Sequence, residues 1–190
     1  MSAEPIDPRL FRSLMRNLPG QVSVVAAGAP GRRNGLTASS VCSLTDLPPT
    51  VLICVNRGAG AHDLIIESGF FSVNALATSQ EEIARVFSGL AGAYGEARFQ
   101  SADWSMGITG APILSSAVCW FECRLSEHRA ASSHTLFFGH VVAGSASPEA
   151  SPLLYLRGSY VGLERQGGVR RSEPQSNWDA EFDRRNVDGE

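Results

Sequence analysis

The sequence predicts a mostly β protein, a largely antiparallel barrel with peripheral helices. Two observations support this fold class. Six or seven runs have the β-branched or alternating pattern of strands, against three helical patterns, and the helices do not alternate strictly with the strands. Strict alternation would favour a Rossmann fold, whereas strands that follow one another directly favour an antiparallel barrel. The predicted strands are Gln21–Ala27, a strand from Gly35, Thr50–Asn56, Phe70–Leu76, Ala117–Glu127, Thr135–Ser145 and Leu153–Leu163.

The first helix should begin at Asp7-Pro8, because Asp is a favoured N-cap and Pro a favoured first helical residue. Pro19-Gly20 should end it. The apolar residues between these points recur at helical spacing; they are Leu10, Phe11, Leu14 and Leu18.

A second helix is expected over Ala61–Ser68. A third should follow Thr78–Glu82, which offers two overlapping capping boxes. Its buried face should consist of Ile83, Val86, Phe87 and Leu90.

Length and composition exclude several classes of protein. The 190 residues are enough for one domain with a sizeable core, which we expect over residues 1–163. No apolar run is long enough to cross a bilayer, and the first residues lack the apolar core of a signal peptide, so a cytoplasmic protein is expected. The net charge of -3 makes nucleic acid an unfavourable partner.

Residues 164–190 form a polar, charged C-terminal tail whose large apolar groups are Trp178 and Phe182. The tail is expected either to be disordered or to pack against a partner subunit.

The spacing of the cysteines, Cys42, Cys54, Cys119 and Cys123, fits no zinc site. We expect small buried thiols in a reducing compartment and no metal site.

The segment from Gly35 to Asn56 is the most informative part of the chain. Small hydroxyl residues, Thr37, Ser39 and Ser40, surround Ala38, and a second strand ends in the polar Asn56. Small residues let a flat ligand approach the backbone, and hydroxyl and main-chain N–H groups can then bond its polar edge or phosphate. The alternative is an edge strand whose hydroxyls face water.

Familiar catalytic signatures are absent: the sequence has no GxSxG elbow, P-loop or HExxH. Gly58-Ala59-Gly60 precedes the second predicted helix and is either an anion-binding turn or a flexible loop. Arg98 could bind phosphate through its planar guanidinium or form an exposed salt bridge.

Further motifs occur in a fixed order along residues 10–163. They are Phe70-Phe71-Ser72-Val73-Asn74, Phe87-Ser88, Arg98-Phe99, Trp104, Gly110-Ala111-Pro112-Ile113-Leu114, Cys123, His134, Gly139-His140-Val141 and Pro152-Leu153-Leu154-Tyr155. Together with the Thr-Ser segment, this ordered set resembles the flavin reductase-like, FMN-binding split-barrel family. That family includes the small reductase components of two-component flavin monooxygenases.

The resemblance implies a split β-barrel and a set of flavin-binding residues. Thr37, Ala38, Ser39 and Ser40 would line the flavin, and Cys54, Val55 and Asn56 would contact it from the adjacent strand. Ala61 and His62 fall where the family places phosphate contacts, although His62 equally suits a helix cap. Phe87 and Ser88 resemble flavin-side positions, and Tyr160 is either a stacking residue or a core tyrosine.

His134 is the strongest histidine candidate. The family commonly has Asp-His here, associated with the nicotinamide side of the flavin, whereas this chain has Ser133 before His134. The carboxylate that would orient the imidazole is therefore absent. The alternative is a structural histidine that bonds a backbone carbonyl.

The resemblance implies a homodimeric flavin reductase that uses NADH or NADPH to reduce FMN or FAD for a partner oxygenase. The N-terminal helix and Trp178/Phe182 are candidate interface elements. Hydride transfer to a flavin needs no protein nucleophile, which agrees with the missing catalytic signatures. One alternative is a flavin-binding protein without physiological reductase activity. Another is an FMN-dependent reductase of a different acceptor, such as a corrinoid or metal chelate.

Overall fold

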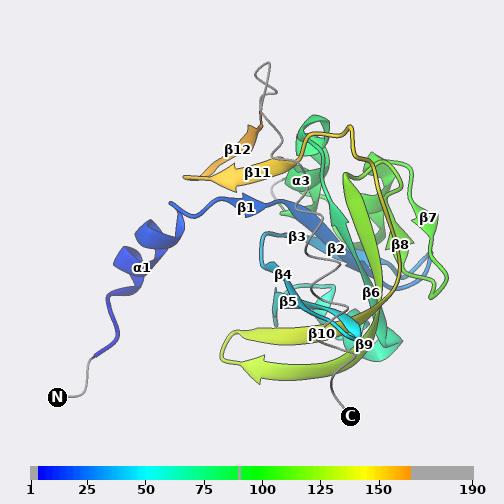
Figure 1. The fold of residues 1–190 in the computed structure, drawn as a ribbon, viewed down its shortest axis with the longest axis horizontal. Coiled ribbons are helices and arrows are strands. Elements are labelled where there is room, and N and C mark those ends of the chain that lie inside the picture. Colours follow the sequence, from blue (N-terminus) through cyan, green and yellow to red (C-terminus); the bar gives the residue numbers. More distant parts are fainter. Residues whose placement is uncertain (1–3, 90, 164–190) are drawn as a thin grey trace, which may run out of the picture.

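The computed structural model describes residues 4–89 and 91–163, and its centre is a seven-stranded antiparallel sheet (Figure 1). The sheet has the order β3-β2-β6-β9-β10-β5-β4. Its strands are β2 (Ser23–Ala27), β3 (Asn34–Ala38), β4 (Val41–Asp46), β5 (Pro49–Asn56), β6 (Phe70–Ala75), β9 (Cys119–Ala131) and β10 (His134–Ala146).

Two smaller sheets and the helices surround this sheet. β1 (Gly20–Gln21), β11 (Leu153–Leu156) and β12 (Ser159–Gly162) form one small sheet, and β7 (Ser105–Met106) pairs with β8 (Pro112–Ile113). The helices are α1 (Pro8–Met15), α2 (His62–Ser68) and α3 (Glu81–Phe87), with 3₁₀ turns η1 (Thr78–Gln80) and η2 (Gly95–Ser101). In the described part no helix is long and apolar enough to cross a membrane.

The seven-stranded sheet curls until its two ends meet. β3 and β4 are its terminal strands, yet only residues 39 and 40 separate them in the chain. Next to this connection, the β4–β5 pairing continues to Ser40: the Cys54 amide donates to the Ser40 carbonyl at 3.2 Å, and the Ser40 hydroxyl donates to the Cys54 carbonyl at 3.0 Å. The predicted antiparallel barrel with peripheral helices is therefore confirmed.

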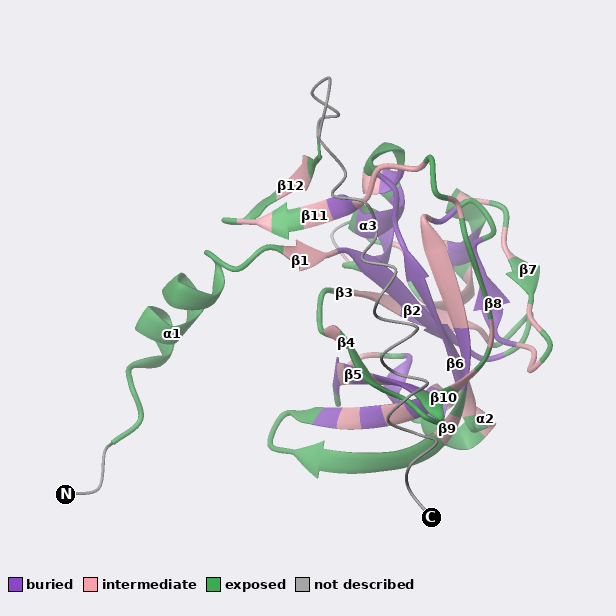
Figure 2. Ribbon diagram, in the orientation of Figure 1, coloured by how far each residue is buried: buried purple, intermediate pink, exposed green. Residues whose placement is uncertain are grey.

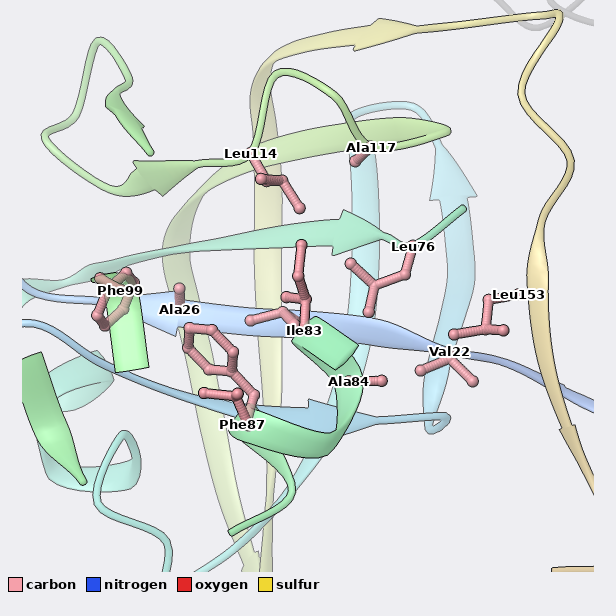
Figure 3. Close-up of a cluster of buried hydrophobic side chains, with 12 residues drawn as sticks. Val22, Ala26, Leu76, Ile83, Ala84, Phe87, Phe99, Leu114, Ala117 and Leu153 are labelled. Atoms are coloured by element: carbon pink, nitrogen blue, oxygen red, sulfur yellow. The ribbon is translucent and has the colours of Figure 1, made fainter. Parts of the chain in front are cut away.

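The core has two apolar clusters on the two faces of the sheet. Alternation along β2 sends Val24 and Ala26 to one cluster and Val25 and Ala27 to the other. Figure 3 shows the first cluster, in which Phe87 and Ile83 of α3 pack against β2. α3 is thus fixed beside the terminal strand β3.

Two of the sequence motifs fit together as a structural unit. The Asn74 side chain donates to the Val24 carbonyl at 3.2 Å and accepts from the Leu114 amide at 2.8 Å. Ser72 donates to the Pro112 carbonyl. Because all these groups are buried, their hydrogen bonds are costly to lose, and they hold the segment that carries β8 on the barrel.

The predicted helices and main strands are present with shifted bounds: α1 is shorter than predicted, whereas β9 and β10 are longer. α1 begins as expected, with the Asp7 carboxylate accepting from Arg9 and Leu10 amides at 2.8 and 3.2 Å, but ends at Met15 instead of Leu18. The predicted strand Gln21–Ala27 is divided into β1 and β2. The predicted strand Leu153–Leu163 is a hairpin, whose turn places Arg157 and Gly158 at φ 53° and 87°.

Other local features differ from the predictions. The capping box at Thr78–Glu82 is wrong: Gln80 caps the turn by accepting from the Ala77 amide at 2.8 Å, while Thr78 donates to the Ser151 carbonyl at 3.2 Å. The strand predicted from Gly35 is divided into β3 and β4. The sequence does not predict β7, β8 or η2, because these short segments lack a sustained apolar period. The predicted C-terminal tail, residues 164–190, lies outside the residues that the structure describes.

α1 stands apart from the barrel and is exposed along its whole length (Figures 1 and 2). Its apolar residues Leu10, Phe11 and Leu14 are 51%, 52% and 54% exposed. The segment after the helix is tied to the β11–β12 turn, since the Arg157 amide donates to the Arg16 carbonyl at 2.8 Å.

Candidate functional site

A cavity of about 840 Å³ lies beside β3, the terminal strand of the sheet. Four segments line it: β3 through Ser39, the loop 58–60 before α2, the end of α3 with the segment 94–98, and the β11–β12 hairpin. Because β3 pairs with β2 on one side only, its other edge offers main-chain groups to a ligand. The volume falls in the range of roughly 300–1,000 Å³ that is usual for small-molecule sites.

The hydroxyl residues of the Thr-Ser segment have different partners. Thr37 donates to the Ala84 carbonyl at 2.7 Å, and Ser40 donates to the Cys54 carbonyl. Among the described residues, Ser39 has no hydrogen-bond partner for its hydroxyl, and it lines the cavity. Ser39 is therefore the hydroxyl of this segment that remains able to donate to a ligand.

Phe87 forms an apolar wall of the cavity and is itself held by aromatic neighbours. Its ring centroid lies 5.1 Å from that of Phe99 and 5.4 Å from that of Trp104. Gly35 of β3 packs directly on Phe87: a Cβ atom at Gly35 would lie 2.8 Å from the ring. Only a glycine lets the strand and this ring come so close.

Tyr160 of β12 and Arg85 of α3 also line the cavity. The Tyr160 ring lies 5.3 Å from that of Tyr155, and the Arg85 guanidinium lies 5.5 Å from the Tyr160 ring centroid. Burial, with a smaller contribution from Tyr155, raises the pKa of Tyr160, so its phenol is neutral at pH 7. The Glu81 carboxylate accepts from Arg85 at 2.5 Å and raises the Arg85 pKa, so Arg85 stays charged with its charge paired.

The loop 58–60 is a tight turn. The Asn56 side chain accepts from the Gly58 amide at 2.8 Å, and the Asn56 carbonyl accepts from the Ala59 amide at 2.9 Å. Asn34 lies against Gly60, where a Cβ atom would come 2.2 Å from the Asn34 amide nitrogen. Asn56 therefore shapes the loop that borders the cavity, although its own side chain is outside the cavity lining.

His62 points into the protein. It is 7% exposed, with Nδ1 2.7 Å from the Asp63 carboxylate and Nε2 2.8 Å from the Thr135 hydroxyl. Ala61 is fully buried. Both ring nitrogens of His62 thus have protein partners, and neither residue lines the cavity.

His134 begins β10 and pairs with Asn56 of β5 across the sheet. It is exposed, and the Ser133 hydroxyl lies 2.9 Å from its Nδ1. Ser133 thus contacts the imidazole nitrogen that the Asp of the family pattern was expected to orient. The Ser133 carbonyl also accepts from the Arg57 amide at 3.0 Å, which ties this corner to the loop 58–60.

The structure brings only part of the predicted set into the cavity. The predicted residues that line it are Thr37, Ala38, Ser39, Phe87, Ser88 and Tyr160. The predicted residues outside its lining are Ser40, Cys54, Val55, Asn56, Ala61, His62 and His134. Val55 is buried in the second apolar cluster, whereas Cys54 is half-buried on the opposite face of β5.

Several lining residues were not assigned to the site from the sequence. They include Asn34, Leu36, Glu81, Arg85 and Tyr94. Arg98, for which the sequence leaves phosphate binding and an exposed salt bridge open, also lines the cavity. Glu81 and Arg85 are four residues apart on α3, a spacing that signals a helical ion pair, and nothing in that pattern indicates a cavity. No group of three or more His, Cys, Asp or Glu in residues 4–89 and 91–163 is placed to hold a metal ion.

Comparison with known proteins identifies the family of the chain. A family model described as "Flavin reductase like domain" matches residues 15–164, so the chain belongs to the flavin reductase-like domain family. The chain is 38% identical over 175 residues to a Methylorubrum populi protein named FMN reductase (NADH) RutF. This alignment covers 91% of the chain and 86% of that protein. The resemblance predicted from the sequence motifs is confirmed.

Solved structures share the fold. Streptomyces globisporus C-1027 NADH:FAD oxidoreductase SgcE6, in complex with NAD and FAD fragments, has a TM-score of 0.77 at 30% identity, covering 87% of this chain and all of that one. BorF, the flavin reductase component of a bacterial two-component tryptophan halogenase, also has a TM-score of 0.77 at 30% identity, covering 84% of this chain.

The residues of the cavity suit a flavin. The free edge of β3 can face the polar edge of a flat ring system, and Ser39 offers an unused hydroxyl. Phe87 and Leu36 supply apolar contact, and the two arginines outnumber the single glutamate, which favours an anionic tail.

The ion pair between Arg33 and Glu96 gives a first testable prediction about η2, which carries part of the cavity wall. Arg33 Nε donates to Glu96 at 2.9 Å, and this hydrogen bond holds the pKa of the Glu96 carboxyl below its ordinary value of 4.5. A depressed pKa stabilises the fold above the unfolded-state value, and that stabilisation is lost as the pH falls through the folded-state pKa. Glu96→Gln should lower the free energy of unfolding at pH 7 by at most about 1 kcal/mol.

Urea unfolding of both proteins between pH 7 and pH 4 measures this difference, which should shrink below about pH 4.5, the unfolded-state value. Glu67→Gln is the matched control. The Arg32 side chain that pairs with Glu67 is 76% exposed, compared with 16% for Arg33. Glu67→Gln should therefore lose less free energy of unfolding than Glu96→Gln. If the difference in free energy of unfolding between wild type and Glu96→Gln did not change with pH, the lowered pKa of Glu96 would be contradicted.

Proposed function

We propose that the protein is an NADH-dependent flavin reductase that reduces FMN in the cavity beside β3. The observation that carries the proposal is the cavity itself, bordered by a free strand edge, an unused serine hydroxyl and a fixed phenylalanine. The relative named FMN reductase (NADH) RutF supports the choice of FMN and NADH. FAD is the second candidate, favoured by the structural neighbour SgcE6, which is an NADH:FAD oxidoreductase.

The residues of the chain act by binding and positioning. When bound, FMN supplies the acceptor for the hydride of the nicotinamide, and no protein acid, base or nucleophile has to react. The β3 edge and Ser39 orient the polar side of the flavin, and Phe87 fixes its position from the α3 side. Holding two rings in reactive contact removes much of the entropic barrier to their reaction.

We place the nicotinamide near His134, Asn56 and Cys54. These residues lie side by side because β5 and β10 pair in register, His134 opposite Asn56 and Leu136 opposite Cys54. They are outside the cavity lining but next to the loop 58–60 that borders it. The Ser133 hydroxyl fixes the His134 ring, so His134 acts as a binding group and no proton transfer is assigned to it.

We also propose a symmetric homodimer. An isolated helix of eight residues is marginal in water, and α1 carries an exposed apolar stripe that nothing in the described part covers. The β4–β5 hairpin likewise has exposed apolar residues, Leu44 of β4 at 52% and Leu47 of the turn at 71%. A second copy offers each of these surfaces a matching partner, as a two-fold interface does.

The product of this reaction is free reduced FMN, and we propose a flavin-dependent oxygenase component as its recipient. BorF is the flavin reductase component of a two-component tryptophan halogenase, which supports a separate flavin-dependent enzyme as the recipient. The cytoplasmic location expected from the sequence remains a prediction.

Ser39→Leu tests the flavin site. A leucine at this rim removes the free hydroxyl and fills space beside the β3 edge, so FMN binding should weaken by roughly 1–3 kcal/mol. Flavin fluorescence titration measures the dissociation constant, and NADH oxidation with FMN measures the reductase activity. Ser145→Leu, at an exposed serine of β10 outside the cavity, should change neither. An unchanged dissociation constant for both FMN and FAD in Ser39→Leu would remove this cavity as the flavin site.

His134→Ala tests the nicotinamide side. Loss of a ground-state contact should raise the KM for NADH several-fold with little change in FMN affinity, because such contacts act mainly on KM. His140→Ala is the control, since His140 is an exposed histidine on the same face of β10. A normal KM accompanied by a lowered melting midpoint would make His134 a structural residue.

The dimer proposal predicts a species of twice 20.3 kDa in sedimentation at micromolar concentration. Leu14→Glu, which places a charge in the apolar stripe of α1, should shift the population toward monomer. Ser13→Glu places the same charge on the other side of the helix and should leave the dimer intact. A wild-type protein that sediments only at 20.3 kDa would reject the dimer.

A further inference from the structure

Arg98 is a half-buried arginine of η2 that lines the cavity, and its guanidinium is held by main-chain carbonyls. Nε donates to the Ala93 carbonyl at 2.9 Å, and Nη1 donates to the Gly35 carbonyl at 2.7 Å and approaches the Phe87 carbonyl at 3.5 Å. These acceptors come from β3, from the end of α3 and from the segment before η2. Arg98 is therefore fixed relative to two walls of the cavity.

The charge of Arg98 has no acidic partner within the part of the chain that the structure describes. Arg32, Arg33 and Arg85 are each paired with a carboxylate, on Glu67, Glu96 and Glu81 respectively. Carbonyl groups satisfy donors of Arg98 but carry no net negative charge. Among the described residues, its Nη2 also makes no hydrogen bond. A fixed, half-buried cation with a free donor at a cavity wall is a preorganised site for an anion.

We infer that Arg98 binds the phosphate group of the flavin, a role that rests on the proposed function. The sequence leads us to expect phosphate contacts at Ala61 and His62, but both residues are buried outside the cavity. A phosphate bound in the cavity therefore takes its hydrogen-bond donors from the lining residues. Arg98 is bound to the carbonyl of Gly35, a residue of β3, the strand whose edge is proposed to hold the ring. The phosphate groups of NADH have the same chemistry as the flavin phosphate, so NADH is the competing ligand for Arg98.

The test compares FMN with riboflavin, which has the same ring system and no phosphate. Arg98→Met should weaken FMN binding roughly 10- to 100-fold, as expected for a lost charge-assisted contact, and should change riboflavin binding less than about threefold. The preference for FMN over riboflavin seen in the wild type should therefore disappear. A structural role would weaken both ligands by the same factor, and that result would overturn the inference.

Arg33→Met is the matched control. Arg33 packs 4.5 Å from the Phe99 ring centroid and anchors η2 through Glu96, but it does not line the cavity. Loosening of η2 alone should thus leave the FMN preference intact. An equal loss of preference in Arg33→Met would contradict a direct contact from Arg98. A rise in the KM for NADH in Arg98→Met, measured with riboflavin as acceptor, would assign Arg98 to the dinucleotide phosphate and also overturn the inference.

Two further results separate this inference from the proposed function and from a folding defect. A wild type that reduces neither flavin with NADH rejects the proposed function, whereas one that binds and reduces both equally well rejects only the role of Arg98. A crystal structure of the wild-type chain with FMN tests the inference without the risk that a variant fails to fold. It should place a phosphate oxygen within hydrogen-bonding distance of Arg98 Nη2, and a phosphate bound elsewhere would overturn the inference.

Discussion

The terminal strands of the seven-stranded sheet, β3 and β4, are joined through Ser39 and Ser40, and the candidate site depends on this connection. A main-chain and a side-chain hydrogen bond between Ser40 and Cys54 extend the β4–β5 pairing up to this connection. Ala38 is paired with Ser23 on β2, so Ser39 is held from both sides at the point where the chain passes from β3 to β4. The closure fixes Ser39 at the rim while it leaves the free edge of β3 facing the cavity. A strand end without this contact would be a mobile loop instead of a binding surface.

Small residues then determine how close the walls of the cavity can come. Gly35 admits the Phe87 ring against β3, and Gly60 admits Asn34 against the loop before α2. Arg98 links β3 to the end of α3, because its guanidinium contacts the carbonyl groups of Gly35 and Phe87. The site is thus built from main-chain groups, glycines and one fixed cation, which suits a reaction in which the protein only binds and orients its partners.

The fold class could be predicted from the sequence, and six of the predicted flavin-side residues line the cavity: Thr37, Ala38, Ser39, Phe87, Ser88 and Tyr160. Strand patterns with long apolar or β-branched runs, such as Thr50–Asn56, survive as regular strands because burial of one face fixes them. The Thr-Ser segment was informative because its small hydroxyl residues interrupt that pattern. Even so, the sequence could not show that Thr37 and Ser40 use their donors within the protein, since Ala84 and Cys54 become their partners only through tertiary packing.

The limits of the sequence are equally clear at His62 and Arg98. Nothing in the local pattern shows that the His62 ring turns inward to Thr135, which is 73 residues away in the chain. Likewise, a helical segment that contains Arg98 does not show whether its charge meets a carboxylate or a carbonyl of Gly35, 63 residues away. Contacts between such distant positions are set by the barrel as a whole.

The central claim is that the chain passes a hydride from NADH to FMN bound beside β3. Anaerobic mixing of the full chain, loaded with one equivalent of FMN, with excess NADH tests it most directly through the absorbance of oxidised flavin. The account predicts rapid bleaching of that band, far faster than for FMN and NADH in buffer alone. A flavin that binds the protein but stays oxidised at the rate seen in buffer would contradict the account and would indicate a flavin-binding protein without reductase activity.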